Sequence, residues 1–182
     1  MMTACDVFLD RDGVIVRGRR DYVKSWDEVE VLDGALDAIA RLCRAGHRVM
    51  VVTNQSAVGR GILTSTDLDA IHHRLSSLVD RTGGSISRYL VCPHAPGDGC
   101  DCRKPRPGLL LRARREMNAD LGTAFVVGDQ LSDLEAAWSV GSRPVLVLSG
   151  ETDTPPHKSG GEYLLASDLS GAANLILAST GR

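Results

Sequence analysis

The sequence has no apolar run that approaches the ~18 residues needed to cross a bilayer, and its amino end lacks a signal-peptide pattern. It also lacks a block of basic residues, since 21 Lys and Arg against 23 Asp and Glu give a net charge of −2. Nucleic acid and anionic membranes are therefore poor partners, and any bound anion must be held by a few local side chains. We expect a cytoplasmic protein that binds neither nucleic acid nor membrane.

The chain also has no room for a second large domain. Its 182 residues, 43% hydrophobic and 24% charged, are enough for one globular domain with a substantial core, so residues 1–182 are expected to form a single domain. Five cysteines are an odd number for a secreted disulfide framework, and three of them lie close together with a histidine between them. This clustering favours metal binding over disulfides.

Apolar runs and helical patterns alternate along the chain, which is typical of a parallel sheet covered by helices. Strands are predicted over residues 5–9, 48–53, 88–92, 124–127 and 144–148, with an edge strand over 163–165. Helices are predicted over residues 34–45, 64–80, 107–119, 131–140 and from 169 onward. A surface loop is predicted over residues 149–161, which are rich in Gly, Pro, Ser and Thr. The predicted fold class is α/β, with a doubly wound, mostly parallel sheet.

Two carboxylates follow the first predicted strand at a spacing of two residues. The run Val7-Phe8-Leu9-Asp10-Arg11-Asp12-Gly13 places Asp10 and Asp12 on one side of the strand's carboxyl end, with Arg11 pointing away from them. Two like charges this close are tolerated where a divalent cation neutralises one, or where one carboxyl holds a proton that it can give away. Both conditions suit attack on a phosphoryl group. A solvated Asp-Gly turn is the structural alternative.

Further polar side chains follow the other predicted strands, where ligands of open parallel sheets bind. They are Thr53, Asn54, Gln55 and Ser56 after the second strand, Asp129, Gln130 and Asp133 after the fourth, and Arg103 and Lys104 between the third and fourth. Together they offer hydroxyl and amide donors for phosphate oxygens, a fixed cation and an acid for a hard metal ion. Each piece alone is more typical of a turn or a helix entry. The presence of all these polar residues at successive strand ends favours a phosphate-binding site.

Three thiols and one imidazole lie within eleven positions, at Cys92, His94, Cys100 and Cys102. Three Cys and one His form a closed tetrahedral zinc set, and two tight pairs joined by a short loop can fold around one ion. A mixture of buried and free thiols is the alternative, but the segment Gly97-Asp98-Gly99 opposes burial. Because no coordination position is left open, a structural zinc ion is predicted that rigidifies the loop 92–106 and the cations it carries.

These residues resemble the four motifs of the haloacid dehalogenase superfamily of aspartyl-nucleophile phosphatases. The matching segments are Asp10-Arg11-Asp12-Gly13, Thr53, Lys104 and Gly128-Asp129. The resemblance implies a Rossmann-like core in which Asp10 attacks phosphorus to form an aspartyl-phosphate. It implies that Asp12 protonates the leaving oxygen and later activates water, while Thr53 and Lys104 hold phosphate oxygens.

The same resemblance implies a Mg²⁺ site made of the Asp10 carboxylate, the Asp12 main-chain carbonyl and Asp129. A divalent ion and a fixed cation also suit the charge that develops on phosphoryl oxygens during transfer. Asp133 either ligates the metal through water or orients Lys104 or Asp129, and the orienting role is favoured.

The segment from Cys92 to Gly108 resembles the zinc loop of the D-glycero-D-manno-heptose 1,7-bisphosphate 7-phosphatases and their histidinol-phosphatase relatives. Thr53-Asn54-Gln55-Ser56 and Gly59-Arg60-Gly61 reinforce this resemblance. Ala57 departs from a common glycine, and Gln130 from a lysine that often follows the metal-binding acid. The resemblance implies a Mg²⁺-dependent phosphatase that releases the 7-phosphate. Histidinol-phosphate phosphatase is the alternative, and a zinc-stabilised phosphate-binding protein without turnover is a remote one.

The intervals between the motifs leave no room for a cap domain, so specificity is expected to come from short loops. These loops are residues 17–27, 55–61 and 93–106. Asn54 and Gln55 are expected to contact the substrate. Arg60 and Arg103, with Arg106 as a further candidate, are expected to bind a second anionic group, such as the C1 phosphate of a sugar bisphosphate. The expected partner is a phosphorylated sugar, bound by a monomer.

Overall fold

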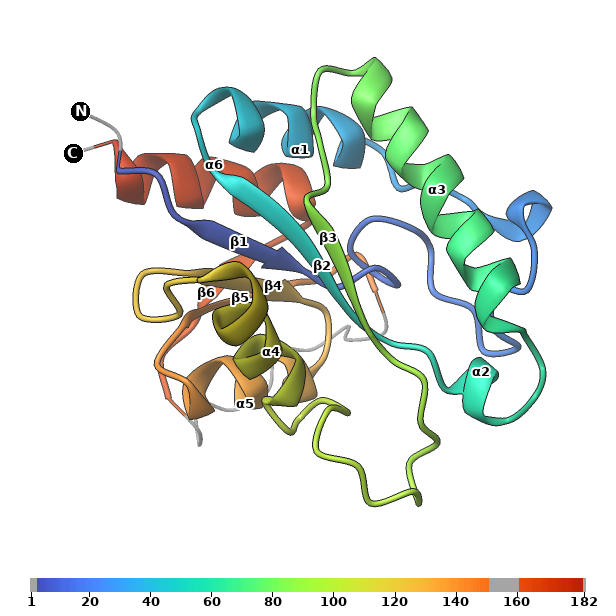
Figure 1. Ribbon diagram of the computed structural model, residues 1–182. Coiled ribbons are helices and arrows are strands. Elements are labelled where there is room, and N and C mark those ends of the chain that lie inside the picture. The colour runs from blue at the N-terminus through green and yellow to red at the C-terminus, as the bar shows by residue number, and fades with distance from the viewer. Residues whose placement is uncertain (1–2, 151–160, 182) are drawn as a thin grey trace.

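A six-stranded, all-parallel sheet lies at the centre of the computed structural model, which describes residues 3–150 and 161–181 (Figure 1). In sheet order the strands are β3 (Arg88–Cys92), β2 (Arg48–Asn54), β1 (Asp6–Leu9), β4 (Phe125–Gly128), β5 (Arg143–Val147) and β6 (Leu164–Ala166). The predicted doubly wound α/β class is confirmed, and the sheet is parallel throughout. The strand order reverses between β1 and β4, which is the switch point where open sheets bind ligands.

Helices cover both faces of this sheet. On one face lie α1 (Ala35–Arg44), α3 (Ser65–Arg81) and α6 (Leu169–Thr180), and on the other α4 (Gly108–Met117) and α5 (Leu131–Ser139). Alternation along β1 feeds both cores, because Val7 and Leu9 pack on the first face and Phe8 on the second. None of the helices that the structure describes is long and apolar enough to cross a membrane.

Each predicted helix and strand is present, with its ends within two residues of the expected positions. Two short elements were not predicted, the 3₁₀ helix η1 (Trp26–Glu28) and α2 (Ser56–Gly59). Thr64 caps the start of α3, since its Oγ1 accepts a hydrogen bond from the Asp67 main-chain N at 3.1 Å. Most of the predicted loop 149–161 lies outside the described residues.

The segments beyond the carboxyl ends of the strands build the site. Between β1 and β2 the chain forms a loop with η1 and then α1, and between β2 and β3 it forms α2 and α3. Between β3 and β4 it forms the zinc loop and α4. Residues 10–124, all of which the structure describes, contain no insertion the size of a cap domain.

Candidate active site and metal sites

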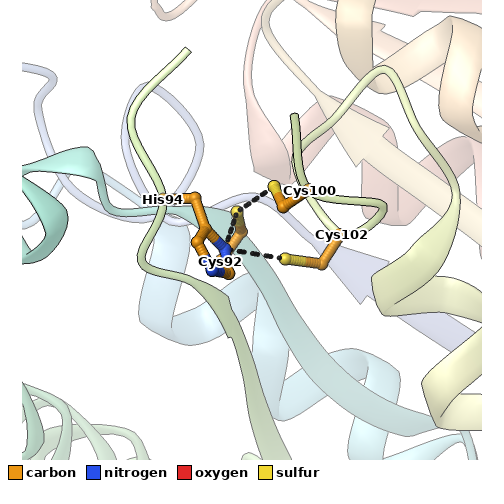
Figure 2. A group of neighbouring side chains, drawn as sticks. All are labelled: Cys92, His94, Cys100 and Cys102. Carbon is orange, nitrogen blue, oxygen red and sulfur yellow. Dashed lines mark hydrogen bonds between the residues drawn. The ribbon is translucent and has the colours of Figure 1, made fainter. Parts of the chain in front are cut away.

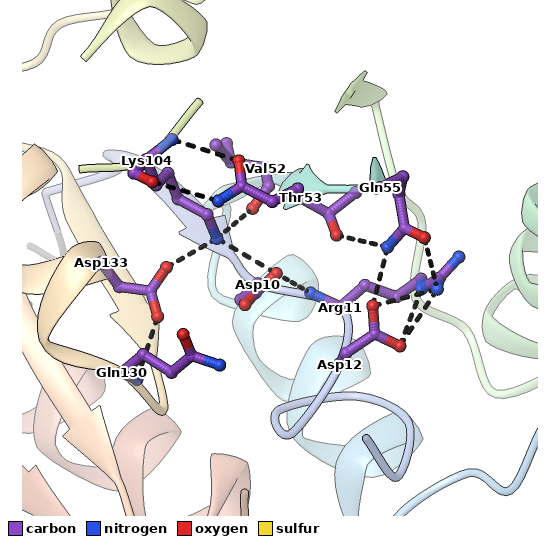
Figure 3. A network of polar contacts seen from close by, with 10 residues as sticks. Asp10, Arg11, Asp12, Val52, Thr53, Gln55, Lys104, Gln130 and Asp133 are labelled. Atoms are coloured by element: carbon purple, nitrogen blue, oxygen red, sulfur yellow. Dashed lines mark hydrogen bonds and ion pairs between the residues drawn. The ribbon is translucent and has the colours of Figure 1, made fainter. Parts of the chain in front are cut away.

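Asp10 follows β1 and lies at the centre of a polar network (Figure 3). Its Oδ1 accepts a hydrogen bond from the Arg11 main-chain N at 2.7 Å and lies 3.1 Å from Lys104 Nζ. The side chain is 12% exposed. Burial raises the pKa of Asp10 to about 7, because the lowering by Lys104 is countered by Asp133, Asp12 and Asp129. Negative charge is therefore in excess around this carboxylate.

Lys104 joins the two sides of the network. Its Nζ lies 2.6 Å from Asp133 Oδ1, donates to the Val52 carbonyl at 2.8 Å and contacts Asp10 as described. The side chain is only 4% exposed. Burial opposes its charge, but Asp10 and Asp133 outweigh burial and raise the pKa of Lys104. The ammonium group is thus a permanently charged, fixed cation beside Asp10, in the position predicted from the sequence.

Three carboxylates form a candidate metal site. Asp10, Asp129 and Asp133 each offer an oxygen, and these oxygens lie within 4.8 Å of one another. Lys104 is the ionic partner of Asp10 and Asp133, and all the donors of the cluster are hard oxygens, so the set fits Mg²⁺. Gly13 belongs to the same arrangement, because its φ is +83° and a side chain there would overlap the Asp129 carboxylate.

Asp133 has the contacts expected of an orienting residue. Its Oδ1 pairs with Lys104, and its Oδ2 accepts a hydrogen bond from the Gln130 main-chain N at 3.1 Å in the capping box of α5. Both oxygens therefore have protein partners (Figure 3). The orienting role of Asp133 stays a prediction, and Asp12, whose carbonyl was expected to bind Mg²⁺, contributes no carboxylate oxygen to the cluster.

Arg11 does not point away from the two carboxylates, as strand alternation predicted. Its Nη2 lies 3.0 Å from both oxygens of Asp12 and donates to Gln55 Oε1 at 2.9 Å. The expectation was wrong because β1 ends at Leu9. Side chains alternate between the two faces only within a strand, and the chain turns directly after Leu9. The sequence showed only an arginine between two acidic residues, and its burial is seen in the structure alone.

The polar residues at the carboxyl end of β2, Thr53 and Asn54, contact other parts of the site. Thr53 is buried, and its Oγ1 accepts a hydrogen bond from Gln55 Nε2 at 2.8 Å. The Asn54 side chain donates to the Lys104 carbonyl at 3.2 Å and accepts from the Lys104 main-chain N at 3.1 Å. Asn54 thus anchors the chain that carries the cation. Binding of phosphate by these residues stays a prediction.

A pocket of about 300 Å³ opens above Asp10, Asp12 and Lys104. Its lining also includes Arg19, Arg20, Tyr22, Gln55, Arg60 and Arg103. Arg103 is held by a hydrogen bond from Nη1 to the His94 carbonyl at 3.2 Å. The expected loops 17–27, 55–61 and 93–106 therefore all contribute to the pocket, although Arg19, Arg20 and Tyr22 were not singled out individually.

Arg106, the further candidate for anion binding, is directed elsewhere. Its Nη1 donates to the Cys100 carbonyl, and it is not among the residues that line the pocket above Asp10. It borders a separate hollow beside the zinc loop instead. Its contact with Cys100 makes it part of the loop's own structure.

The four predicted zinc ligands come together as expected (Figure 2). Cys92 Sγ lies 3.6 Å from His94 Nδ1 and 3.7 Å from Cys100 Sγ, and His94 Nδ1 lies 3.3 Å from Cys102 Sγ. Zn–S and Zn–N bonds of tetrahedral sites place neighbouring donor atoms about 3.4–3.8 Å apart. The donor set and its spacing therefore fit a structural Zn²⁺.

Burial, together with hydrogen bonds to the other thiols, raises the pKa of the Cys92 thiol to about 12. Without a metal this thiol keeps its proton. Metal binding must therefore release a proton from it, which couples zinc affinity to pH.

Comparison with known proteins gives concordant matches. The HAD-hydrolase-like family model matches residues 101–172. The D-glycero-beta-D-manno-heptose-1,7-bisphosphate 7-phosphatase of Pseudomonas aeruginosa is 43% identical over 174 residues, 94% of this chain and 97% of that protein. The D-glycero-alpha-D-manno-heptose-1,7-bisphosphate 7-phosphatase of Mycobacterium bovis is 44% identical over 136 residues, 74% of this chain and 72% of that protein.

A solved structure is similar over nearly the whole chain. It is the D,D-heptose 1,7-bisphosphate phosphatase of B. bronchiseptica complexed with magnesium and phosphate, with a TM-score of 0.91 and 38% identity. The match covers 96% of this chain and 99% of that one.

Proposed function

The chain belongs to the haloacid dehalogenase-like hydrolases, in the family of the bacterial heptose bisphosphate phosphatases, and from this premise we propose the reaction it performs. It is a phosphoric monoester hydrolase that removes the 7-phosphate of D-glycero-D-manno-heptose 1,7-bisphosphate with Mg²⁺. The observation that carries this proposal is the convergence of Asp10, Lys104 and Asp129 beneath a pocket lined by arginines. A protein that only bound phosphate would have no use for a carboxylate at the point of attack.

Asp10 is the proposed nucleophile. Its Oδ1 is held by Lys104 and by the Arg11 main chain, so the carboxylate is kept in one orientation towards the pocket. Attack on the 7-phosphorus forms an aspartyl-phosphate and breaks the bond to the sugar oxygen, which takes a proton from Asp12. Water then attacks the aspartyl-phosphate, and Asp12 accepts its proton. Phosphate leaves, Asp10 is again a carboxylate and Asp12 again carries the proton that it gives to the next leaving oxygen.

Positive charge near the transferring group supports both steps. Lys104 and the Thr53 hydroxyl would hold phosphate oxygens. Lys104, Asn54 and Gln55 line the pocket, and Thr53 lies buried against Gln55. The Asp10 carboxylate, the Asp12 carbonyl and Asp129 would hold Mg²⁺, with Asp133 orienting Lys104. When bound, this ion neutralises the charge that develops on the phosphoryl oxygens.

Specificity comes from the loops that cover this one-domain enzyme. Arg60 and Arg103 line the pocket and would bind the C1 phosphate, and Arg20 is a third cation in the lining. A histidinol phosphate has no second phosphate for these arginines. The alternative substrate is therefore not favoured, in line with the names of the relatives. We further propose that the enzyme acts in the cytoplasm as a monomer.

Steady-state kinetics with a small substrate panel tests this function. The panel contains both anomers of the heptose bisphosphate, the corresponding 7-monophosphate and histidinol phosphate. We expect kcat/KM to be at least ~100-fold higher for one bisphosphate anomer than for histidinol phosphate. A preference for histidinol phosphate would overturn the assignment.

Matched arginine variants locate the second phosphate. Arg103→Met should lower kcat/KM for the bisphosphate by about 10- to 100-fold, the loss of one charge-assisted contact, and barely change it for the 7-monophosphate. Arg106→Met, which alters a neighbouring arginine outside the pocket, should change neither. Equal losses on both substrates would argue against the C1-phosphate role of Arg103.

A further inference from the structure

We propose that Arg11 is a positioning residue for catalysis, whose buried guanidinium group fixes the Asp12 carboxylate that exchanges protons with the leaving oxygen and water. This inference rests on the proposed function, because it assumes the role given above to Asp12. It assigns a role to the side chain of Arg11, which lies between the two reacting carboxylates in the sequence and has no role in the function proposed above.

The burial of Arg11 is the first observation. Arg11 is 1% exposed and is the largest fully buried side chain that the structure describes. Burying a guanidinium group is costly unless its charge is paired and its hydrogens are bonded. A neutral residue would be easier to accommodate if position 11 served only to fill space. The arginine is therefore retained for its contacts.

The contacts of Arg11 converge on Asp12. Nε and Nη2 lie 3.3 and 3.0 Å from Asp12 Oδ1, and Nη2 lies 3.0 Å from Oδ2. Gln55 Nε2 donates to Oδ2 at 2.7 Å, and Gln55 Oε1 accepts from Arg11. The Asp12 side chain is 29% exposed, so one side faces the pocket while the other is held by this pair. The planar fork of arginine fixes the plane of a carboxylate as well as its position.

Two elements distant in sequence, α3 and β3, support the Arg11 side chain. Nη1 lies 3.3 Å from His72 Nε2 in α3, and the His72 ring stacks on Tyr89 of β3 with centroids 4.1 Å apart. Ser76 Oγ, one turn along α3, donates to the Tyr89 hydroxyl at 3.2 Å. Burial and the Arg11 charge lower the pKa of His72 to about 3, so the imidazole is neutral and can accept from the guanidinium group. The chain of contacts thus runs from α3 and β3 to the reacting carboxylate.

The two carboxylates diverge as a result. In Figure 3 the Asp12 side chain is turned towards Arg11 and Gln55, whereas Asp10 is turned towards Lys104. Each carboxylate has its own cation, since the Arg11 guanidinium group pairs with Asp12 and the Lys104 ammonium group with Asp10. This separation gives Asp10 and Asp12 different orientations although they are two residues apart. Without Arg11, only Gln55 would hold the Asp12 side chain.

First-turnover kinetics with p-nitrophenyl phosphate test the proposal. Its leaving group departs without a proton, so the release of the first equivalent of nitrophenol depends on Asp10 and not on proton donation by Asp12. Later turnovers require Asp12 to activate water. Arg11→Met, similar in volume but uncharged, should keep the first-turnover rate within about 3-fold and lower the steady-state rate about 100-fold. Arg11→Lys should lie between this variant and the parent, and it carries the test if Arg11→Met does not fold.

One further variant, Asp12→Asn, separates the possible outcomes. Asp12→Asn should show the same pattern as Arg11→Met, and if it does not, the role of Asp12 in the proposed function fails. If Asp12→Asn shows the pattern but both Arg11 variants keep parental steady-state rates, the role of Arg11 is wrong. If the Arg11 variants lose the first-turnover rate and the steady-state rate equally, Arg11 has only a structural role, and the proposed positioning role is wrong.

Arg48 provides a matched control for loss of an arginine fork. Its Nε and Nη2 lie 2.6 and 3.0 Å from the two oxygens of Asp6, at the opposite end of β1 from the site. Arg48→Met should therefore lower stability without changing the ratio of first-turnover to steady-state rate. The heptose bisphosphate, whose leaving oxygen needs a proton, should be turned over about 100-fold more slowly by Arg11→Met and at the parental rate by Arg48→Met.

Discussion

At the scale of single residues, the assignment of Asp10 as nucleophile makes the sharpest prediction. Asp10→Asn keeps the size of the side chain and its hydrogen bond from the Arg11 main chain but removes the attacking charge. We expect kcat to fall by about 10⁴-fold or more, because a covalent step cannot proceed without its nucleophile. Steady-state assays on the heptose bisphosphate measure this loss, and circular dichroism checks the fold. The exposed Asp69→Asn serves as the control. Retained turnover in Asp10→Asn would contradict the assignment.

His72 predicts a pH dependence of stability. Its pKa is about 3 in the fold, below the ordinary value of 6.5, because burial and Arg11 oppose its charge. The unfolded chain therefore binds a proton below pH 6.5 that the folded chain does not, and this residue's contribution to stability is lost as the pH falls from 6.5 towards 3. At pH 5 the cost is about 2 kcal/mol.

Denaturant unfolding at pH 7 and pH 5 measures this effect. The parent protein should lose about 2 kcal/mol more than His72→Gln on acidification, because glutamine has no proton to gain. His73→Gln, altered at the exposed neighbouring histidine, should behave like the parent. The same pH dependence in all three proteins would show that His72 is free to ionise in the folded state.

Single residues were predictable from the sequence where chemistry and spacing agree. Asp10, Lys104 and the four zinc ligands come together as predicted. They could be predicted because few functions other than phosphoryl transfer and zinc binding need these residue types at these spacings. Arg11 was not predictable, because its orientation depends on where β1 ends and on a cavity that α3 and β3 close around it. The substrate contact of Asn54 stays a prediction, whereas the bonds of its side chain to the Lys104 main chain depend on tertiary packing that the sequence did not indicate.

At the scale of elements, the zinc loop links a metal site to the catalytic cation. Cys102 lies two residues before Lys104, and Asn54 clamps the Lys104 main chain from β2. The zinc site and Asn54 both hold the chain at Lys104, and loss of zinc should leave Asn54 alone to hold it. We expect Cys102→Ser to bind less zinc and to lower kcat/KM by about 10- to 100-fold through misplacement of Lys104.

Zinc content and kinetics of matched cysteine variants test this link. Cys43→Ser, altered on α1 away from the zinc set, should keep both zinc and activity. Chelation of zinc from the parent should reproduce the defect of Cys102→Ser, and re-addition of zinc should restore the parent alone. Full activity after complete removal of zinc would show that Asn54 suffices to place Lys104.

The long elements were predictable because hydrophobic period and end signals agree in them. The α3 helix has an apolar stripe, a Thr64 cap and a length of 17 residues, and it ends within one residue of the prediction. The short elements η1 and α2 have three and four residues. Segments this short show no hydrophobic periodicity, so their formation depends on contacts with the rest of the fold.

At the scale of the whole molecule, sheet topology concentrates negative charge at one edge. The strand order places β1 beside β4, so Asp10 and Asp129 meet although they are far apart in sequence, and α5 adds Asp133. The sequence predicted this meeting from the α/β alternation alone, because parallel strands put all their carboxyl ends on one side. Burial of three carboxylates against one lysine is unfavourable for the fold, and it is relieved by a divalent cation.

Mg²⁺ should therefore stabilise the zinc-loaded protein by binding only the folded state. At a concentration of 100 times its dissociation constant, the free energy of unfolding should rise by about 2.7 kcal/mol. Asp129→Asn removes one of the three negative charges and an expected ligand. Its unfolding should respond little to Mg²⁺, while in metal-free buffer it should be at least as stable as the parent, because less negative charge is buried. Chemical unfolding with and without Mg²⁺ measures both effects, with Asp69→Asn as the exposed control. If Asp129→Asn is less stable than the parent without metal and equally responsive to Mg²⁺, the crowded carboxylates do not form the magnesium site.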